Sequence, residues 1–312
     1  MRDFWTNKKI LVTGGNGFIG SHIVDRLINT RDVSPNNIII PHHKTCDLKV
    51  NSNCQEILEG VDIVIHAAAD VGGLEYSREN PAKQYYECSI VDLNMIEAAK
   101  NYGVDKFIFV SCSTSYPQYA DSPLSEEAVF LGEPTMSHYG HGWAKRNEII
   151  LTKIYYQQYQ LNTGAVIANN TFGPKDNFDP RSSHVIPALI RKFMTEKKVS
   201  IWGDGSQIRD FIYVEDLAEG ILLAAEKLPP GEFVNLGSGK GVTIRELVYL
   251  ISKLTNFEGP IAFDKSKPIG EKIRVVNIEK AIRMIGFIPK FSLEEGLKRT
   301  ITWYKSYILN NN

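Results

Sequence analysis

The sequence predicts an α/β fold, a doubly wound parallel sheet joined to a smaller, interleaved C-terminal subdomain. Three observations predict it. Short β-rich runs alternate with longer helical patterns as far as residue 170, which is the pattern of a parallel sheet with helices on both faces. The runs 63–65 and 107–110 are continuously apolar, as in strands that are covered on both sides. After Gly173 the chain becomes richer in proline, glycine and polar residues, which indicates a change of architecture.

The elements of the N-terminal part follow in chain order. The first helix carries Ile19, Ile23 and Leu27 on one face, the spacing of an amphipathic helix that packs on a sheet. Together the elements define an expected first domain over residues 1–170. We expect strands at residues 9–13, 37–40, 62–66, 106–110 and 163–170, and helices from Gly20, near 82–101 and near 142–160.

Residues 171–312 are expected to form mainly the second subdomain. They contain a strand-like run at 199–202 and two capping boxes, Thr243 with Glu246 and Ser292 with Glu295, each before an apolar helical pattern. The apolar runs 211–214 and 232–236 predict further buried strands that return to the sheet. Segments near 208–238 are therefore assigned to the first domain.

Composition narrows the possible functions. With 35 basic and 36 acidic residues and a pI of about 6.7, the chain has no general attraction for nucleic acid or anionic lipid. No apolar run reaches the roughly 18 residues of a membrane helix. The four cysteines are scattered without metal-ligand spacing, which predicts no metal site and a reducing, cytoplasmic location.

A glycine-rich turn follows the first strand and opens the first helix. Its glycines have the spacing that permits a tight turn, close approach of the backbone to a pyrophosphate, and packing of helix on strand. The helix N-terminus then faces the phosphates. The alternative is a glycine turn that binds no ligand. We predict a Rossmann domain whose dinucleotide contacts Gly14, Gly17, Phe18, Ile19 and Gly20.

The end of the second strand indicates the type of dinucleotide. It lacks the acidic residue that would bind the ribose hydroxyls of NAD, which favours NADP(H) over NAD(H). We expect His43 and Lys44 to meet the 2′-phosphate and Asp47 and Leu48 to lie beside the adenine, although a solvated basic loop is the alternative. Ala67, Ala68 and Ala69 follow the third strand. Two roles are possible for them: contact with the cofactor, or ordinary packing at the end of the strand.

Four segments resemble the extended short-chain dehydrogenase/reductases, and within them the GDP-L-fucose synthase family. They are residues 66–73 (HAAADVGG), 170–178 (NTFGPKDNF), 183–189 (SHVIPAL) and 202–211 (WGDGSQIRDF). The resemblance spans nearly the whole chain. It implies that a hydride moves between nicotinamide and a sugar carbon, and that a Tyr-x-x-x-Lys helix with a Ser or Thr supplies protons and orientation.

The catalytic positions that the resemblance implies are partly altered. Lys145 matches the lysine, but His141 stands four residues before it, in place of the tyrosine. Cys112 stands at the Ser or Thr position, with Ser111 and Ser113 on either side of it as substitutes. Neutral imidazole is a very weak acid, so the expected proton donor is the His141 imidazolium, with a pKa lowered by the Lys145 ammonium. We therefore expect reduction to become faster below neutral pH.

The resemblance also implies a thiol and a histidine that move protons at the carbons beside a ketone. The histidine is His184, but Thr114 aligns with the thiol. A hydroxyl is far less acidic than a thiol, so the sequence favours reduction over epimerisation. Cys112 lies two residues from Thr114 and points to the same side of an extended chain, so it is either a displaced thiol catalyst or an inert buried cysteine.

The implied substrate is a GDP-sugar, whose diphosphate requires cations. Arg209 is the main candidate, with Lys192 or Arg191 behind it and Arg274 nearer the nucleotide; a surface charge is the alternative for each. The expected substrate-binding residues are Val71, Gly72, Gly73, Asn170, Asn177, Val185, Lys192, Trp202, Arg209 and Arg274.

The predicted function is NADPH-dependent reduction of a GDP-4-keto sugar, with or without epimerisation, in nucleotide-sugar biosynthesis. Two other functions compete: a nucleotide-sugar 4-epimerase or oxidase that holds NAD(H) tightly, and a catalytically silent dinucleotide sensor. The resemblance implies a homodimer packed through the helices near 82–101 and 142–160. Their outward faces are expected to carry Tyr85, Tyr86, Tyr155 and Tyr156.

Overall fold

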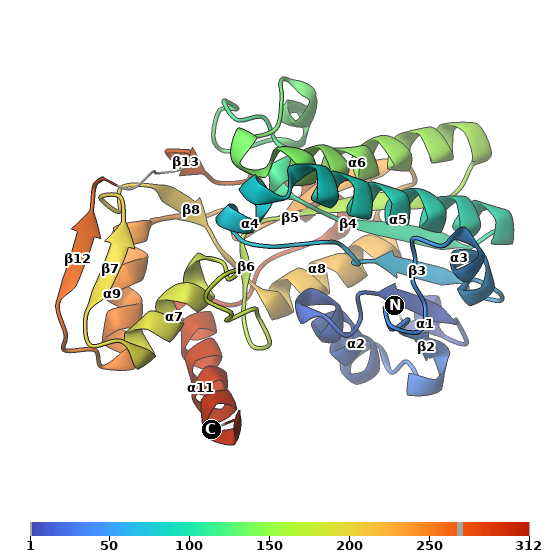
Figure 1. The fold of residues 1–312 in the computed structure, drawn as a ribbon. Helices are drawn as coiled ribbons and strands as arrows, with labels where there is room; N and C mark the ends of the chain where they lie inside the picture. The colour runs from blue at the N-terminus through green and yellow to red at the C-terminus, as the bar shows by residue number, and fades with distance from the viewer. Residues whose placement is uncertain (1, 267–270, 312) are drawn as a thin grey trace.

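A central parallel sheet organises the computed structural model of the chain, which describes residues 2–266 and 271–311 (Figure 1). Its six strands lie in the order β10-β5-β4-β3-β1-β2, and every neighbouring pair is parallel. This confirms the predicted doubly wound sheet. The strands are β1 (Ile10–Thr13), β2 (Ile38–Ile39), β3 (Ile63–His66), β4 (Lys106–Cys112), β5 (Thr163–Ala168) and β10 (Glu232–Leu236).

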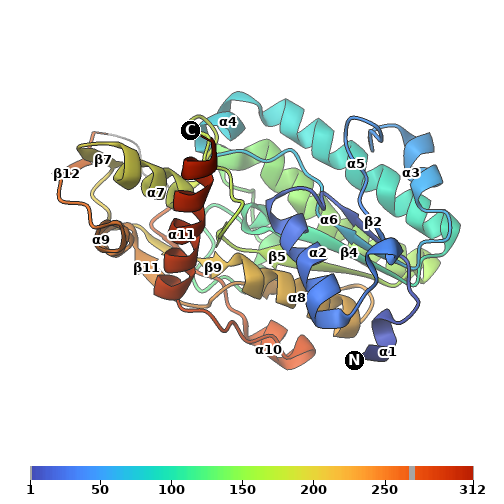
Figure 2. The ribbon, with the colours of Figure 1, turned by 90° about the horizontal axis from the view of Figure 1, so that it is seen from below.

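Helices cover both faces of the sheet, so its inner strands β1, β3, β4 and β5 are buried along nearly their whole length. On one face α2 (Phe18–Arg31) and α8 (Val214–Lys227) pack against the strands, together with α10 (Glu279–Ile285). On the other face lie α3 (Asn51–Ile57), α5 (Pro81–Tyr102) and α6 (Tyr139–Tyr159). Figure 1 shows α5 and α6 above the sheet, and Figure 2 shows α2 and α8 from below. Two short helices, α1 (Arg2–Trp5) and α4 (Leu74–Glu79), complete this part.

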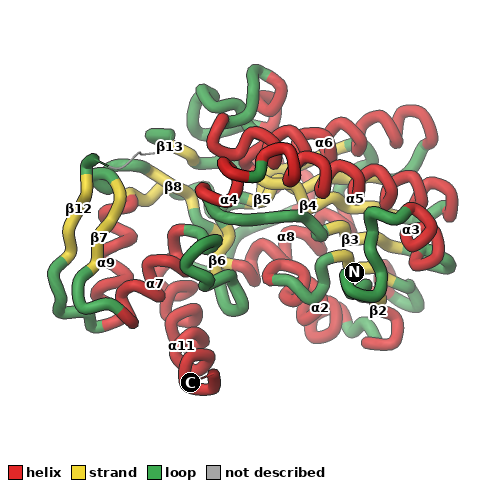
Figure 3. Tube along the Cα trace, in the orientation of Figure 1, coloured by secondary structure: helices red, strands yellow, loops and turns green. Residues whose placement is uncertain are grey.

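A smaller set of strands and helices stands at one end of the sheet (Figure 3). It contains a three-stranded sheet in the order β11-β8-β13 and the pair β12-β7. Its helices are α7 (Val185–Thr195), α9 (Ile244–Thr255) and α11 (Leu293–Asn311), and they share a separate apolar core. Its strands are β7 (Val199–Trp202), β8 (Ile208–Asp210), β11 (Gly241–Thr243), β12 (Ile261–Asp264) and β13 (Ile273–Arg274).

One strand assignment is wrong. The run 232–236 returns to the main sheet as β10, as expected, but the run 211–214 does not. Only β9 (Ile212–Tyr213) is a strand there, and it pairs with β6 (Thr171–Phe172) outside the main sheet. The run is apolar because α8 starts at Val214, so both the short strand and the first turn of the helix are buried.

Two helices begin earlier than the sequence predicts, and these earlier starts affect the site. Helix α2 starts at Phe18, two residues before the expected start, and α6 starts at Tyr139, three residues before. His141 and Lys145 therefore lie on the same helix, four residues apart on one face.

The outer surfaces of α5 and α6 carry most of the expected tyrosines. Tyr85, Tyr86 and Tyr156 are exposed, whereas the Tyr155 hydroxyl donates to Glu97 of α5 across 2.9 Å and so belongs to the packing between the two helices. In the described residues, no helix has the length and apolar character needed to cross a membrane.

Candidate functional site

A large cavity lies between the main sheet and the smaller set of strands. Its volume is about 1570 Å³, and it extends from the glycine-rich turn after β1 to β7 and β8. Every site residue expected from the sequence lines it, except Lys44. The carboxyl ends of the parallel strands open into this space, which is where ligands bind in open α/β sheets. The cavity exceeds the 300–1,000 Å³ of an ordinary small-molecule pocket, so it has room for two ligands.

The glycine-rich turn has the geometry that a pyrophosphate requires. Gly14 has φ +68, and a Cβ on it would lie 2.8 Å from the carbonyl oxygen of Ala67. A Cβ on Gly20 would lie 2.1 Å from the carbonyl oxygen of Gly14, so the helix can approach the turn only without side chains. Helix α2 begins with neither a side-chain cap nor an acidic residue in its first turn. Its first N–H groups therefore remain available to phosphate oxygens, and these residues fit a dinucleotide.

The loop after β2 places its basic residues differently from the expectation. Lys44 is exposed and does not line the cavity, because the loop turns back at His42: the N–H groups of Thr45 and Cys46 both donate to the His42 carbonyl at 2.9 Å. His42 and His43 line the cavity instead, with their rings stacked at 4.7 Å. A 2′-phosphate bound here would meet the histidines first.

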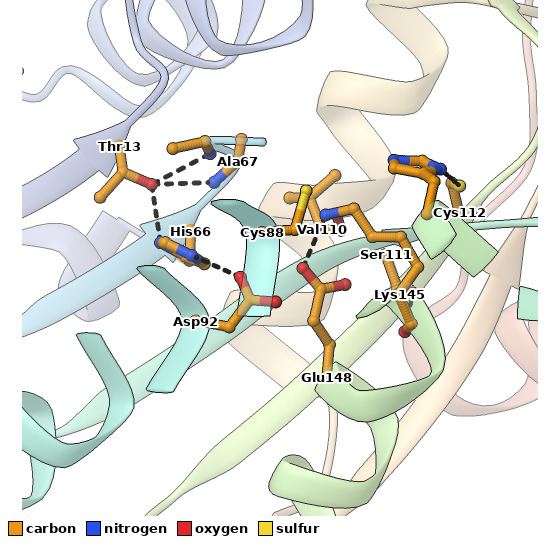
Figure 4. Close-up of polar contacts among 12 residues, drawn as sticks. Thr13, His66, Ala67, Cys88, Asp92, Val110, Ser111, Cys112, Lys145 and Glu148 are labelled. Atoms are coloured by element: carbon orange, nitrogen blue, oxygen red, sulfur yellow. Dashed lines mark hydrogen bonds and ion pairs between the residues drawn. The ribbon is translucent and has the colours of Figure 1, made fainter. Parts of the chain in front are cut away.

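Lys145 is the most enclosed cation of the site, with 3% of its surface exposed. Its Nζ donates to the Val110 carbonyl at 3.1 Å and to Glu148 Oε1 at 2.6 Å (Figure 4). An ammonium has three N–H groups, so one remains for a ligand in the cavity. Burial lowers the pKa of Lys145, but the Glu148 and Asp92 carboxyl groups outweigh burial and raise it above the ordinary value. Lys145 is therefore a cation.

His141, Cys112 and Thr114 form one hydrogen-bonded group at the end of β4. Thr114 Oγ1 lies 3.1 Å from His141 Nδ1 and 2.7 Å from Cys112 Sγ, and Sγ lies 3.8 Å from Nδ1. His141 Nε2 is buried without a partner in the described protein. Burial, and secondly Lys145, lowers the pKa of His141 to about 4. The ring is therefore neutral at physiological pH, in contrast to the expected imidazolium, and the pH dependence of reduction stays a prediction.

The neighbouring serines have different surroundings. Ser113 lines the cavity beside this group, but the Ser111 hydroxyl donates to the Lys145 carbonyl at 2.7 Å and so supports the helix. His184 lines the same cavity at the N-cap of α7, and Val185 follows it.

The substrate end of the cavity contains three candidate cations. Arg209 has one N–H bonded to the Ile208 carbonyl at 2.9 Å and faces Glu271 at 3.9 Å. Lys192 Nζ donates to the Ser200 carbonyl at 3.1 Å, and Arg191 lines the cavity with a buried Nε that has no partner. The remaining expected contacts, Val71, Gly72, Gly73, Asn170, Asn177 and Trp202, border the same space.

Arg274 borders the cavity, and its guanidinium also holds a loop of the protein. Its guanidinium donates to the carbonyls of Ser113 at 2.8 Å and of Tyr116 and Pro117 at 3.3 Å each. The side chain is 7% exposed. Most of its hydrogen-bonding capacity is therefore used to hold the loop after β4, although the residue still borders the cavity.

Sequence reasoning missed a buried group of ionisable residues behind Lys145. Glu148 pairs with this lysine, and Asp92 of α5 pairs with His66 of β3 at 3.1 Å. The one signal available was the (i, i+3) spacing of Lys145 and Glu148. Within the described residues, no group of three metal-binding side chains comes together.

Known proteins are similar to this chain over nearly its full length. Residues 10–237 match the model of the NAD dependent epimerase/dehydratase family. A GDP-L-fucose synthase from Sinorhizobium fredii is 36% identical, over 97% of this chain and 96% of that protein. A GDP-6-OMe-4-keto-L-xylo-heptose reductase from C. jejuni has a TM-score of 0.90 at 26% identity, covering 97% of this chain and 99% of that one.

A second solved structure carries a cofactor. It is a GDP-mannoheptose C4 reductase from Campylobacter jejuni with NADP bound, with a TM-score of 0.87 at 27% identity and coverage of 96% of this chain and 99% of that one. The chain thus belongs to the NAD-dependent epimerase/dehydratase family and is an NAD(P)-dependent, nucleotide-sugar-modifying enzyme of the extended short-chain dehydrogenase/reductase type.

Proposed function

We propose that this enzyme is an NADPH-dependent reductase of a GDP-4-keto sugar. The observation that supports the proposal is the cavity itself, which is lined by Lys145 and His141, by a glycine turn suited to pyrophosphate and by Arg209. The names of the similar enzymes support a GDP-sugar and a ketone at C4. In this assignment NADPH supplies the hydride, and the protein binds, orients and protonates the sugar.

His141 is the proposed donor to the sugar oxygen. In this proposal Thr114 donates its hydroxyl hydrogen to Nδ1, 3.1 Å away, so that the neutral ring carries its hydrogen on Nε2, the atom without a partner in the described protein. As hydride reaches C4, the new alkoxide takes this hydrogen, and Nδ1 takes one from the Thr114 hydroxyl. Thr114 is restored by the Cys112 thiol, 2.7 Å away, and the resulting thiolate regains a proton from water. The ketone thereby gains one hydride and one proton.

Lys145 has an orienting role in this scheme. One of its N–H groups is free for a ribose hydroxyl of the cofactor, and the other two are held by the Val110 carbonyl and by Glu148. His43 and its stacked neighbour His42 would face the 2′-phosphate, which supports NADP(H) over NAD(H). At the other end of the cavity, Arg209 and Lys192 are the proposed cations for the diphosphate of the GDP-sugar. A homodimer through the exposed faces of α5 and α6, in the cytoplasm, completes the proposal.

The proposed activity is reduction without epimerisation. Purified enzyme should oxidise NADPH only when a GDP-4-keto sugar is added, and the product should carry deuterium from labelled NADPH at C4. In D₂O, no deuterium should enter C3 or C5, because Thr114 stands where the family's thiol is expected. Rapid exchange at these carbons that is lost in Cys112→Ser would show instead that the displaced thiol catalyses epimerisation. Failure to oxidise NADPH with any such ketone would contradict the proposed reaction.

A further inference from the structure

Behind Lys145, away from the cavity, lies a closed group of ionisable side chains that the proposed reaction does not use. Its members are His66 of β3, Asp92 of α5 and Glu148 of α6, and each is 0% exposed. Figure 4 shows the Asp92 carboxyl group between the His66 ring and the Glu148 carboxyl group, and the two carboxyl groups interact electrostatically. Such residues are rarely buried unless they are paired, so their charges must be balanced within this group.

The hydrogen bonds determine the state of His66. Thr13 Oγ1 accepts the N–H groups of Ala67 and Ala68 at 3.1 and 3.2 Å, so its own hydrogen points to His66 Nδ1 at 2.8 Å. The ring therefore carries its hydrogen on Nε2 and donates it to Asp92 Oδ1 at 3.1 Å. Burial, and to a smaller extent Lys145, lowers the pKa of His66 to about 4, against the raising effect of Glu148. His66 is consequently a neutral donor and adds no positive charge.

The two carboxyl groups face only one cation. Lys145 binds Glu148 Oε1, while Glu148 Oε2 and Asp92 Oδ2 are buried without a hydrogen-bond partner in the described protein. If both groups were ionised, the interior would hold a net negative charge, at a cost of several kcal/mol. A proton on one of them removes this charge. It also provides a hydrogen where two acceptors otherwise have none.

The electrostatic surroundings agree with one retained proton. Burial is the largest cause that raises the pKa of Asp92 to about 7 and that of Glu148 to about 8, against the lowering effect of Lys145. The ionisable groups that face the pair are His66 on β3, His141 and Lys145 on α6, with Cys88 on α5 and Cys112 on β4 beside the lysine. Lys145 is the only one of these that is a cation at neutral pH.

We propose that Asp92 and Glu148 hold one proton between them at neutral pH and act together as positioning residues for Lys145. A single counter-charge keeps the ammonium between Glu148 and the Val110 carbonyl, with its third N–H directed to the cavity. Loss of the shared proton at higher pH adds a negative charge behind the cofactor site. This charge favours the cationic nicotinamide of NADP⁺ over the neutral one of NADPH. The effect on cofactor binding rests on the proposed function, whereas the shared proton does not.

Infrared spectroscopy of the protein without ligands tests the shared proton directly. Asp176 is another buried carboxyl group whose pKa burial raises to about 7, so all measurements use the Asp176→Asn background. We expect a carbonyl band of a buried, neutral carboxylic acid at pH 7 that disappears above about pH 9. The band should be absent at pH 7 in Asp92→Asn and in Glu148→Gln, since each leaves one ionised carboxylate with Lys145. The proposal is overturned if the carbonyl band is unchanged in both Asp92→Asn and Glu148→Gln. It is also overturned if the Asp176→Asn parent protein shows no such band at pH 7.

Cofactor binding tests the positioning role without turnover. The ratio of the NADP⁺ and NADPH dissociation constants, measured by titration calorimetry, should shift about tenfold toward NADP⁺ between pH 6 and pH 9. In Asp92→Asn the ratio should be independent of pH and equal to the parent value at pH 6. A merely structural role would change the thermal stability but leave the pH dependence in place, and that result overturns the positioning role. If the infrared band and the pH dependence of cofactor binding are as expected but no sugar is reduced, only the proposed function is contradicted.

Discussion

At the scale of single residues, the neutral state of His141 determines how the site protonates a sugar oxygen. Burial is the main cause that lowers its pKa to about 4, and Lys145 is the second. A group with a lowered pKa is deprotonated at every pH above that value, so the ring is neutral throughout the physiological range. The hydrogen on Nε2 must then be replaced through Nδ1, which makes Thr114 and Cys112 part of the same unit.

The first prediction concerns the pH dependence of hydride transfer. If the imidazolium were the donor, the rate would fall about a hundredfold from pH 6 to pH 8, because its population falls tenfold per unit above the pKa. We expect instead a rate that is nearly constant over this range, measured by single-turnover oxidation of NADPH. His141→Ala should lower this rate by about 10²–10³-fold. Tyr139→Phe is the control, since Tyr139 does not line the cavity; loss in this variant and not in His141→Ala would identify the tyrosine as the donor.

A second residue-scale prediction concerns the choice of cofactor. We expect NADPH to be preferred over NADH by at least tenfold in kcat/KM, about 1.4 kcal/mol. His43→Asp should reduce this preference, because the histidine lines the cavity and a carboxylate would repel a 2′-phosphate. Lys44→Asp should reduce it less, since Lys44 lies outside the lining. A larger effect at Lys44 than at His43 would show that this loop changes its conformation when the cofactor binds.

At the scale of secondary-structure elements, β13 controls the loop after β4. Arg274 at the end of β13 donates to three carbonyls of residues 113–117, so an element of the smaller set of strands fixes the residues that contact His141. The same strand is held in its sheet by pairing of Arg274 with Arg209 of β8. Arg274, which the sequence analysis gives as a candidate ligand of the substrate, thus connects the loop after β4 with β8, the strand that carries Arg209.

The prediction at this scale compares the two arginines. Arg274→Met leaves buried carbonyls without donors and should lower the free energy of unfolding by about 3 kcal/mol, with a fall in kcat. Arg209→Met should change stability little and raise the KM for the GDP-sugar, because Arg209 holds only one carbonyl and faces the cavity. Urea denaturation and steady-state kinetics distinguish the two roles. If Arg274→Met raised the KM and left the free energy of unfolding unchanged, Arg274 would be a ligand of the nucleotide and not a support of the loop.

At the scale of the whole molecule, the cavity lies between the main sheet with its helices and the smaller set of strands and helices. The glycine turn and Lys145 belong to the main sheet and its helices, whereas Trp202 and Lys192 belong to the smaller set of strands and helices. We keep the division near residue 170, with segments near 208–238 returning, as a proposal for the domain boundary. Ligands that contact both parts are expected to stabilise the molecule as a unit.

The prediction at this scale is measured by thermal unfolding. A ligand at 100 times its Kd stabilises the native state by roughly 2.7 kcal/mol, so NADPH should raise the Tm by several degrees. GDP alone should also raise the Tm, and the two together should raise it further, because their expected sites lie at different ends of the cavity. NADH at the same concentration should have a smaller effect. Competition between NADPH and GDP, seen as no added shift, would contradict two separate sites.

The sequence by itself determined the sheet and the glycine turn, and the site residues that it predicted line the cavity with the exception of Lys44. Strand and helix patterns are local, and the carboxyl ends of parallel strands necessarily meet at one edge. For this reason Gly14, Lys145, His141 and Arg209 could be placed in one site from their positions along the chain.

Only the tertiary structure decided the protonation states of the site residues and their hydrogen-bond partners. Whether His141 is protonated depends on burial, and burial depends on β4, α5 and α6 together. The same is true of Asp92, whose partner His66 lies 26 residues away in the chain. Lys44 lies outside the cavity because the loop turns back at His42, and Arg274 has carbonyl partners in residues 113–117 that its position in the sequence does not reveal. These outcomes depend on contacts between distant segments, which a one-dimensional pattern does not contain.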